Sequence, residues 1–217
     1  MTVSAAEPER DCALCPRLHD FIAEWRVREP GWHNAPVSTW LPPEGPQCVR
    51  LLIVGLAPGL RGANRTGRPF TGDFSGDMLY ATLKAHGFAT GTFESRSDDS
   101  LRLSGTAVTN AVRCLPPGNK PVAAEVNTCR QFLTATIDRF TNLQAIVTLG
   151  KIAHDSTIRA FGERVAVHPF KHDVATEIGG ISIVSSYHCS RYNINTGVLT
   201  PAMFEQVFQK AAHLAAD

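Results

Sequence analysis

A glycine-rich stretch at residues 55–76 has the composition of a ligand-binding loop. It contains six glycines, three arginines and one central carboxylate, Asp73. The stretch follows the apolar run Leu51–Val54 and precedes a helix-like segment that begins at Asp77, so it connects a predicted strand to a predicted helix. Glycine gives a ligand access to backbone N–H groups, because no Cβ is in the way and positive φ is allowed. We therefore expect this loop to bind a ligand.

Two pairs of cysteines are spaced as candidate metal ligands. Cys12 and Cys15 form a C-x-x-C pair, while Cys114 and Cys129 flank a loop rich in proline and glycine and part of a predicted helix. The N-terminus is polar and acidic, without the apolar segment of a secretory signal, which predicts a cytoplasmic or nucleoid-associated protein in a reducing compartment. Paired thiolates in such a compartment indicate a metal site rather than disulfides. Four thiolates suit either Zn²⁺ or a [4Fe–4S] cluster, and composition does not choose between them.

The elements that must position these residues alternate between strand-like and helix-like segments. Continuous apolar character, typical of strands buried on both faces, occurs at Leu51–Gly55, Ala107–Asn110, Ala145–Leu149 and Ile181–Tyr187. Helix-like segments lie at 77–86, 123–140, 151–161 and 201–215, with a further N-terminal helix at 18–29. The alternation predicts an α/β fold, a three-layer α/β/α domain around a central four-stranded, mainly parallel sheet.

Three unusual segments follow predicted strands. They are the glycine-rich loop, the TNAVRC segment at 109–114 and the YHCSRYN segment at 187–193. Ligands of open parallel sheets bind at the carboxyl ends of the strands. We therefore expect these three segments to face one cleft.

The length and composition are those of a single globular domain. With 217 residues, 43% apolar and 19% charged, we expect one domain over residues 1–217 that carries an N-terminal Cys-x-x-Cys extension and acts as a monomer. No apolar run approaches the roughly 18 residues that cross a membrane, so we expect no membrane partner. The net charge of +1 is uninformative about nucleic acid. Six basic residues either form a basic rim around the cleft or are solvated surface residues: Arg61, Arg65, Arg68, Arg113, Lys120 and Arg191.

Four motifs, in this order, resemble those of the family-five uracil-DNA glycosylases, the UDGb type: GLAPG (55–59), GRPFTGD (67–73), TNAVRC (109–114) and SYHCS (186–190). The resemblance extends from Cys12 to about Phe204. It implies the uracil-DNA glycosylase fold and a monofunctional enzyme that removes uracil, and other deaminated bases such as hypoxanthine, from DNA and leaves an abasic site. It also implies a [4Fe–4S] cluster with Cys12, Cys15, Cys114 and Cys129 as ligands, with structural Zn²⁺ as the alternative.

A glycosylase takes its base out of the stack and holds it in a pocket. Phe70 can offer an aromatic face to the flipped base, unless it is an ordinary core residue. Backbone amides around Gly55, Ala57 and Gly59 can bond to the base edge. Arg191 and Tyr192 can fill the gap left in the duplex, or else belong to a surface loop without that role.

Three side chains are candidates for the chemistry that the resemblance implies. His188 would donate to uracil O2 as negative charge develops on the leaving base. Asn110 would contact the base or help to position water, although asparagine is also a common turn residue. Asp73 would stabilise the sugar cation or orient the attacking water; its alternative role is that of a helix N-cap.

The GLAPG turn lacks a side chain that can activate water. Leu56 and Ala57 stand where related glycosylase families carry an acid or an amide. This absence keeps open a second interpretation, a catalytically weak module that binds uracil-containing DNA. The small Ala57 also leaves space in the pocket for bases bulkier than uracil. Cys189 stands where the family usually has proline, which puts the rigidity of its loop in doubt.

Overall fold

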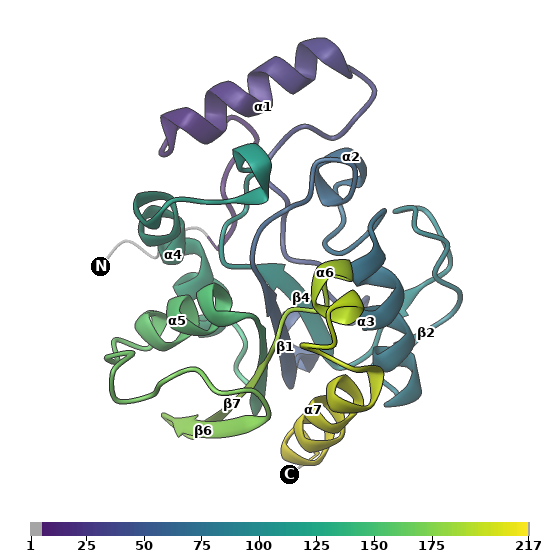
Figure 1. Ribbon diagram of the computed structural model, residues 1–217, viewed down its shortest axis with the longest axis vertical. Coiled ribbons are helices and arrows are strands. Elements are labelled where there is room, and N and C mark those ends of the chain that lie inside the picture. The colour runs from purple at the N-terminus through teal and green to yellow at the C-terminus, as the bar shows by residue number, and fades with distance from the viewer. Residues whose placement is uncertain (1–5, 217) are drawn as a thin grey trace.

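Five strands form a mainly parallel sheet in the computed structural model, which describes residues 6–216 (Figure 1). Their spatial order is β4-β1-β5-β7-β6, and only β6 runs antiparallel to its neighbour. The bounds are β1 Leu51–Gly55, β4 Thr106–Asn110, β5 Ala145–Leu149, β6 Val174–Ile178 and β7 Ile181–Ser186. The α/β class and the four predicted strands are confirmed, and all residues of β1, β4 and β5 are buried.

The prediction of four strands was wrong by one, because β6 carries no core-facing pattern. Its side chains are exposed or half-buried along its whole length, as expected of an edge strand. β6 reaches the sheet through a tight hairpin whose turn is Gly179–Gly180. Both glycines have positive φ, +61° and +79°, which is the conformation that a two-residue hairpin turn requires.

Helices cover both faces of the sheet and complete the three predicted layers. The core on one face includes α3 (Phe74–Ala85) and α7 (Pro201–Leu214), and the core on the other includes α4 (Ala123–Asp138) and α5 (Lys151–Ala160). α3 begins at Phe74 rather than near Asp77, because the Asp73 side chain accepts a hydrogen bond from the Ser75 N–H and caps the helix. Smaller elements are η1 Pro46–Cys48, α2 Ala63–Thr66, β2 Ala89–Thr90, β3 Arg102–Leu103, η2 Pro117–Asn119 and α6 Arg191–Asn195.

α1 (Pro16–Arg28) belongs to a third apolar cluster, away from the two sheet cores. Figure 1 shows it at the same end of the molecule as α2, which follows β1. Leu18 and Ile22 of α1 pack in this cluster with Val112, Leu115 and Phe132. Among residues 6–216, no helix is both long and apolar enough to cross a membrane.

The N-terminal segment is tied to the domain by Glu7. Its carboxylate accepts hydrogen bonds from the fully buried Arg113 (2.9 Å) and from the Thr39 N–H (3.1 Å), and it lies 3.4 Å from Arg139. A second nitrogen of Arg113 donates to the Thr136 hydroxyl at 2.8 Å. Glu7 thus supplies the counter-charge for a guanidinium that has no access to water.

Replacing Glu7 with glutamine should lower the free energy of unfolding by about 3 kcal/mol, because it leaves the Arg113 charge buried without its anion. Urea-induced unfolding measures this change. Glu9→Gln is the matched control, since Glu9 is exposed and lies two residues away. Equal losses in the two variants would contradict a specific role for the Glu7–Arg113 ion pair.

Candidate active site

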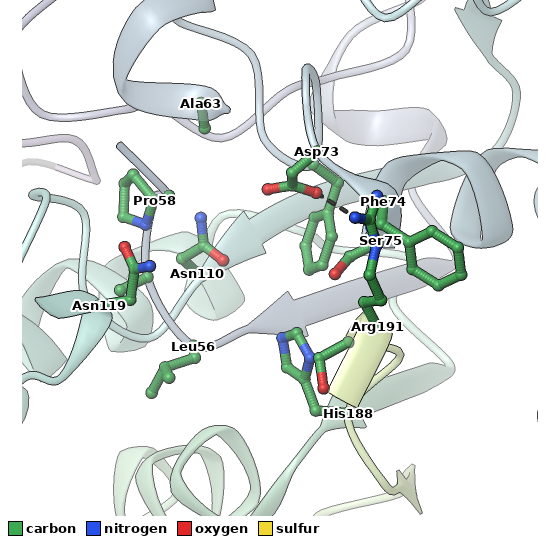
Figure 2. Close-up of a pocket in the computed structure, with 14 residues that line it drawn as sticks. Leu56, Pro58, Ala63, Asp73, Phe74, Ser75, Asn110, Asn119, His188 and Arg191 are labelled. Atoms are coloured by element: carbon green, nitrogen blue, oxygen red, sulfur yellow. Dashed lines mark hydrogen bonds between the residues drawn. The ribbon is translucent and has the colours of Figure 1, made fainter. Parts of the chain in front are cut away.

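A cavity of about 430 Å³ opens beyond the carboxyl ends of β1 and β4 (Figure 2). Its volume lies within the range of small-molecule sites. All three segments predicted to share a cleft line it, together with η2. The lining residues are Leu56, Ala57, Pro58, Gly59, Ala63, Phe70, Asp73, Phe74, Ser75, Asn110, Asn119, His188, Ser190 and Arg191.

Phe70 and Asn110 line this cavity, whereas Gly55, which was predicted to bind the base, lies against both side chains and is not a lining residue. A Cβ at Gly55 would clash with both the Phe70 ring and the Asn110 side-chain oxygen, so glycine is needed here for close approach rather than for its φ. Phe70 itself has a φ of +51°, which is strained for a bulky residue. Its ring centroid lies 6.3 Å from that of His188, with 27° between the planes. An aromatic face and an imidazole therefore border the same space.

Asp73 has one carboxylate oxygen in the helix cap and the other on the cavity side. Oδ1 accepts from Ser75 N at 3.1 Å, whereas Oδ2 lies so near Gly62 that a Cβ there would be 2.6 Å from it. Figure 2 shows the carboxylate extending into the cavity on the side of Pro58 and Asn110. The side chain reaches solvent through the cavity mouth, but protein surrounds it on the other sides, and this desolvation raises its pKa. The capping role of Asp73 and its position in the cavity are thus compatible.

His188 follows β7 and directs its ring into the cavity (Figure 2). Burial lowers its pKa to about 4, so the imidazole is neutral at physiological pH. The Asn193 side chain donates to the His188 carbonyl at 2.8 Å and fixes the backbone behind the ring. A neutral ring so placed can donate one N–H without carrying a positive charge.

Arg191 and Tyr192 follow His188 and were predicted to share one role in the duplex, but the structure places them differently. Arg191 lines the cavity, and its guanidinium lies 5.2 Å from the centroid of the Phe74 ring. Tyr192 is 74% exposed and does not line the cavity. Cys189 is fully buried, and its thiol lies 3.7 Å from the Ser75 carbonyl. Burial, with the nearby Asp73 charge, raises the pKa of Cys189 to about 12, which argues against a nucleophilic thiolate.

Asn119 is a cavity residue that the sequence analysis missed. It ends η2 in the LPPGNKP loop, has a φ of +56°, and lies across the cavity mouth (Figure 2). The Pro-Pro-Gly-Asn composition indicates a turn and hides any other role. Only its place between Cys114 and Cys129 connects it to other candidate residues.

Cys12, Cys15, Cys114 and Cys129, the four predicted metal ligands, all belong to the third apolar cluster. Burial raises the pKa of Cys129 to about 11 and also raises those of Cys15 and Cys114, and the neighbouring thiolates add to each shift. The Arg113 N–H donates to the Cys129 sulfur at 3.3 Å. Within residues 6–216, however, no three His, Cys, Asp or Glu side chains converge on a position for a single metal ion.

Comparison with known proteins agrees with this architecture. The family model of the uracil DNA glycosylase superfamily matches residues 42–212. A type-5 uracil-DNA glycosylase of Thermus thermophilus is 41% identical over 206 residues, which are 94% of each chain. The protein of the same name from Mycobacterium bovis is 41% identical and covers 94% of this chain and 78% of its own. The type-5 uracil-DNA glycosylase of Pyrobaculum aerophilum is 35% identical, and the match covers 93% of this chain and 88% of the relative. The resemblance drawn from the motifs is confirmed: the chain belongs to the uracil DNA glycosylase superfamily and, within it, to the type-5 enzymes.

Proposed function

We propose that this uracil-DNA glycosylase, a DNA-repair hydrolase of N-glycosidic bonds, flips uracil out of the duplex into its cavity before it breaks the bond and leaves an abasic site. Its membership of the uracil DNA glycosylase superfamily supports uracil as the substrate. The observation that carries the mechanism is the single cavity that Phe70, Asn110, Asp73 and His188 all line. An extruded base can enter such a cavity, whereas a paired base cannot.

The base lies against the Phe70 ring in this proposal, between the GLAPG turn and His188. Backbone N–H groups of Ala57 and Gly59, together with the Asn110 amide, bond to the polar edge of uracil. Arg191 lines the cavity and binds a phosphate next to the flipped nucleotide. The exposed Tyr192 enters the space that the flipped base leaves in the duplex. The stacking face and the hydrogen bonds together select a flat base with polar edges.

Bond breaking precedes water attack in this mechanism, so cleavage of the bond does not depend on a base in the GLAPG turn. The bonding electron pair leaves with uracil N1, and His188 donates its N–H to O2 as that oxygen gains negative charge. The Asp73 carboxylate faces the positive sugar and accepts a proton from the water that adds to C1′. Asn119 and Asn110 orient this water from two sides of the cavity.

We expect the enzyme to excise hypoxanthine as well as uracil, because Ala57 leaves room beside the base. Duplexes that contain uracil, hypoxanthine or thymine, followed by alkaline scission, test this expectation. Ala57→Val should lower the hypoxanthine rate about tenfold more than the uracil rate, since it narrows the cavity. Strict preference of the parent enzyme for uracil would contradict it. Binding of uracil duplex without scission above a His188→Ala control would favour the alternative, a catalytically weak binding module.

We further propose a [4Fe–4S] cluster held by Cys12, Cys15, Cys114 and Cys129. Four thiols in one apolar cluster form a donor set that suits iron and sulfur. Structural Zn²⁺ bound by the same four thiolates is the alternative. The cluster would have a structural role, joining the N-terminal segment to the loop that carries Asn119.

Protein purified without oxygen should be brown and contain about four irons per chain. Cys12→Ser and Cys114→Ser should lose most of this iron, whereas Cys48→Ser should retain it, because Cys48 lies outside the third apolar cluster. Colourless protein with stoichiometric zinc would contradict the proposed cluster.

We also propose that the protein is a monomer that acts in the cytoplasm on nucleoid DNA. Sedimentation with and without duplex tests the monomeric state.

A further inference from the structure

The loop that presents Phe70 is closed by the side chain of Arg68. Arg68 is buried, with 5% exposure, and its Nε donates to the Thr71 hydroxyl at 2.8 Å. This bond joins the residues on either side of Pro69–Phe70, where Phe70 has its positive φ. The Tyr80 hydroxyl also donates to the Pro69 carbonyl. Two hydrogen bonds therefore hold the strained turn, one between Arg68 and Thr71 on either side of it and one from Tyr80 to Pro69 within it.

The other end of the guanidinium is held by Asp99. Nη1 and Nη2 of Arg68 donate to the two Asp99 oxygens at 2.8 and 2.7 Å, the bidentate arrangement that favours arginine over lysine. Each oxygen also accepts a backbone N–H, from Leu101 at 3.1 Å and from Glu94 at 2.9 Å. Only donors surround this carboxylate, and its side chain has no exposure to solvent.

An aromatic cage limits the movement of the guanidinium. The Arg68 Cζ lies 4.6 Å from the Trp40 ring centroid, 5.6 Å from that of Phe93 and 5.8 Å from that of Tyr80. Phe93 and Asp99 both belong to the segment between β2 and β3, which supplies no residue to the cavity. The Asp99 carboxylate of this segment is nevertheless buried against Arg68, although it has no part in the proposed chemistry.

We propose that the Arg68–Asp99 ion pair is a positioning device for base recognition, holding Phe70 at the angle at which a flipped base can stack on it. The proposal rests on the proposed stacking role of Phe70. Arg68 acts through Thr71 on the turn, and Asp99 acts through Arg68, so neither residue touches the substrate. The segment between β2 and β3 then serves the site although it lies outside the cavity.

Asp99→Asn tests this proposal. The substitution replaces one accepting oxygen of Asp99 with an NH₂ group, which faces the N–H donors of Arg68 and the backbone and cannot accept from them. We expect single-turnover excision of uracil to fall about 10- to 100-fold, as for a displaced positioning group. Affinity for duplex carrying the uncleavable 2′-fluoro-deoxyuridine should fall in parallel, while affinity for undamaged duplex stays unchanged. Asp98→Asn is the matched control, since Asp98 is exposed and forms its ion pair with the exposed Arg96. Equal losses in the two variants would overturn the proposal.

A double-mutant cycle with Phe70→Leu distinguishes positioning from general support of the fold. In the Phe70→Leu background, Asp99→Asn should lower the excision rate less than about twofold, because the group it positions is gone. The same factor in both backgrounds would overturn the proposal. If Phe70→Leu alone leaves excision unchanged, the stacking role of Phe70 fails, which is a separate result from additivity in the cycle.

Thr71→Val and Arg68→Lys keep the proposal testable if Asp99→Asn does not fold. Thr71→Val removes the hydroxyl that accepts the Arg68 Nε–H and that donates to the Pro69 carbonyl at 3.1 Å. It should weaken binding of the fluorinated substrate while affinity for undamaged duplex stays unchanged. The melting temperature should fall modestly, because the buried Arg68 Nε loses its acceptor. Arg68→Lys keeps the charge but loses the fork and should show the same loss. Full activity and binding in both folded variants would overturn the device.

Discussion

Replacing Asp73 with asparagine should lower the rate of uracil excision about 10³-fold while the protein remains as stable as before. A carboxylate about 4 Å from the sugar cation contributes roughly 4 kcal/mol at an effective dielectric near 20. That contribution exists only in the transition state, so its loss appears in the rate of the chemical step. Single-turnover kinetics with uracil duplex measure it.

The same substitution separates the two roles of Asp73. Asparagine caps helices about as well as aspartate, so the free energy of unfolding should change by less than about 0.5 kcal/mol. If Asp73 were only a helix cap, neither the excision rate nor the free energy of unfolding would change. Asp77→Asn, four residues along α3 and outside the cavity, is the control and should retain activity. Similar rate losses in Asp73→Asn and Asp77→Asn would point to the charge of the helix end instead.

The pH profile gives an independent reading of Asp73. Desolvation raises its pKa, so the carboxylate takes up a proton at a higher pH than an ordinary aspartate does. The ionised form is the active one, and the rate should therefore fall as the pH decreases through this raised value. The residual activity of Asp73→Asn should lack that acidic limb.

Much of the fold was predictable because its signals are local. The buried strands β1, β4 and β5 are continuous apolar runs, and the three segments that follow predicted strands placed the cleft correctly. β6 was not predictable, since an exposed edge strand has no burial pattern to detect. Asn119 was hidden for another reason: its turn composition explains it fully until the fold brings η2 to the cavity.

The contacts that hold the site are nonlocal and left no signal in the sequence. Glu7 pairs with Arg113 across 106 residues, and Asp99 pairs with Arg68 across 31. Arg68 and Arg113 were predicted to lie either in a basic rim or on the solvated surface, and the structure buries both instead. That part of the prediction was wrong, because a charged residue buried with a distant counter-charge has the same local sequence as an exposed one.

His188→Ala should lower the excision rate about 10²- to 10³-fold, the usual effect of removing a donor aimed at developing negative charge. His188→Gln retains a neutral N–H donor and should recover part of this loss. Affinity for undamaged duplex should be equal in all three proteins, because the ring contacts only the extruded base. Single-turnover rates and duplex binding together measure the effect. Loss of duplex affinity would assign His188 to DNA binding rather than to catalysis.

The neutral state of His188 predicts how the excision rate and the stability depend on pH. With a pKa of about 4, the folded imidazole gains no proton as the pH falls from 8 to about 5, so His188 adds no titration to the rate in that range. The unfolded chain does gain that proton near its ordinary pKa of about 6.5, so the histidine lowers stability as the pH falls from 6.5 towards 4. His188→Ala should therefore lose less stability than the parent over this interval. A parent rate that falls as the pH rises through 6.5 would instead require an imidazolium and contradict donation by the neutral ring.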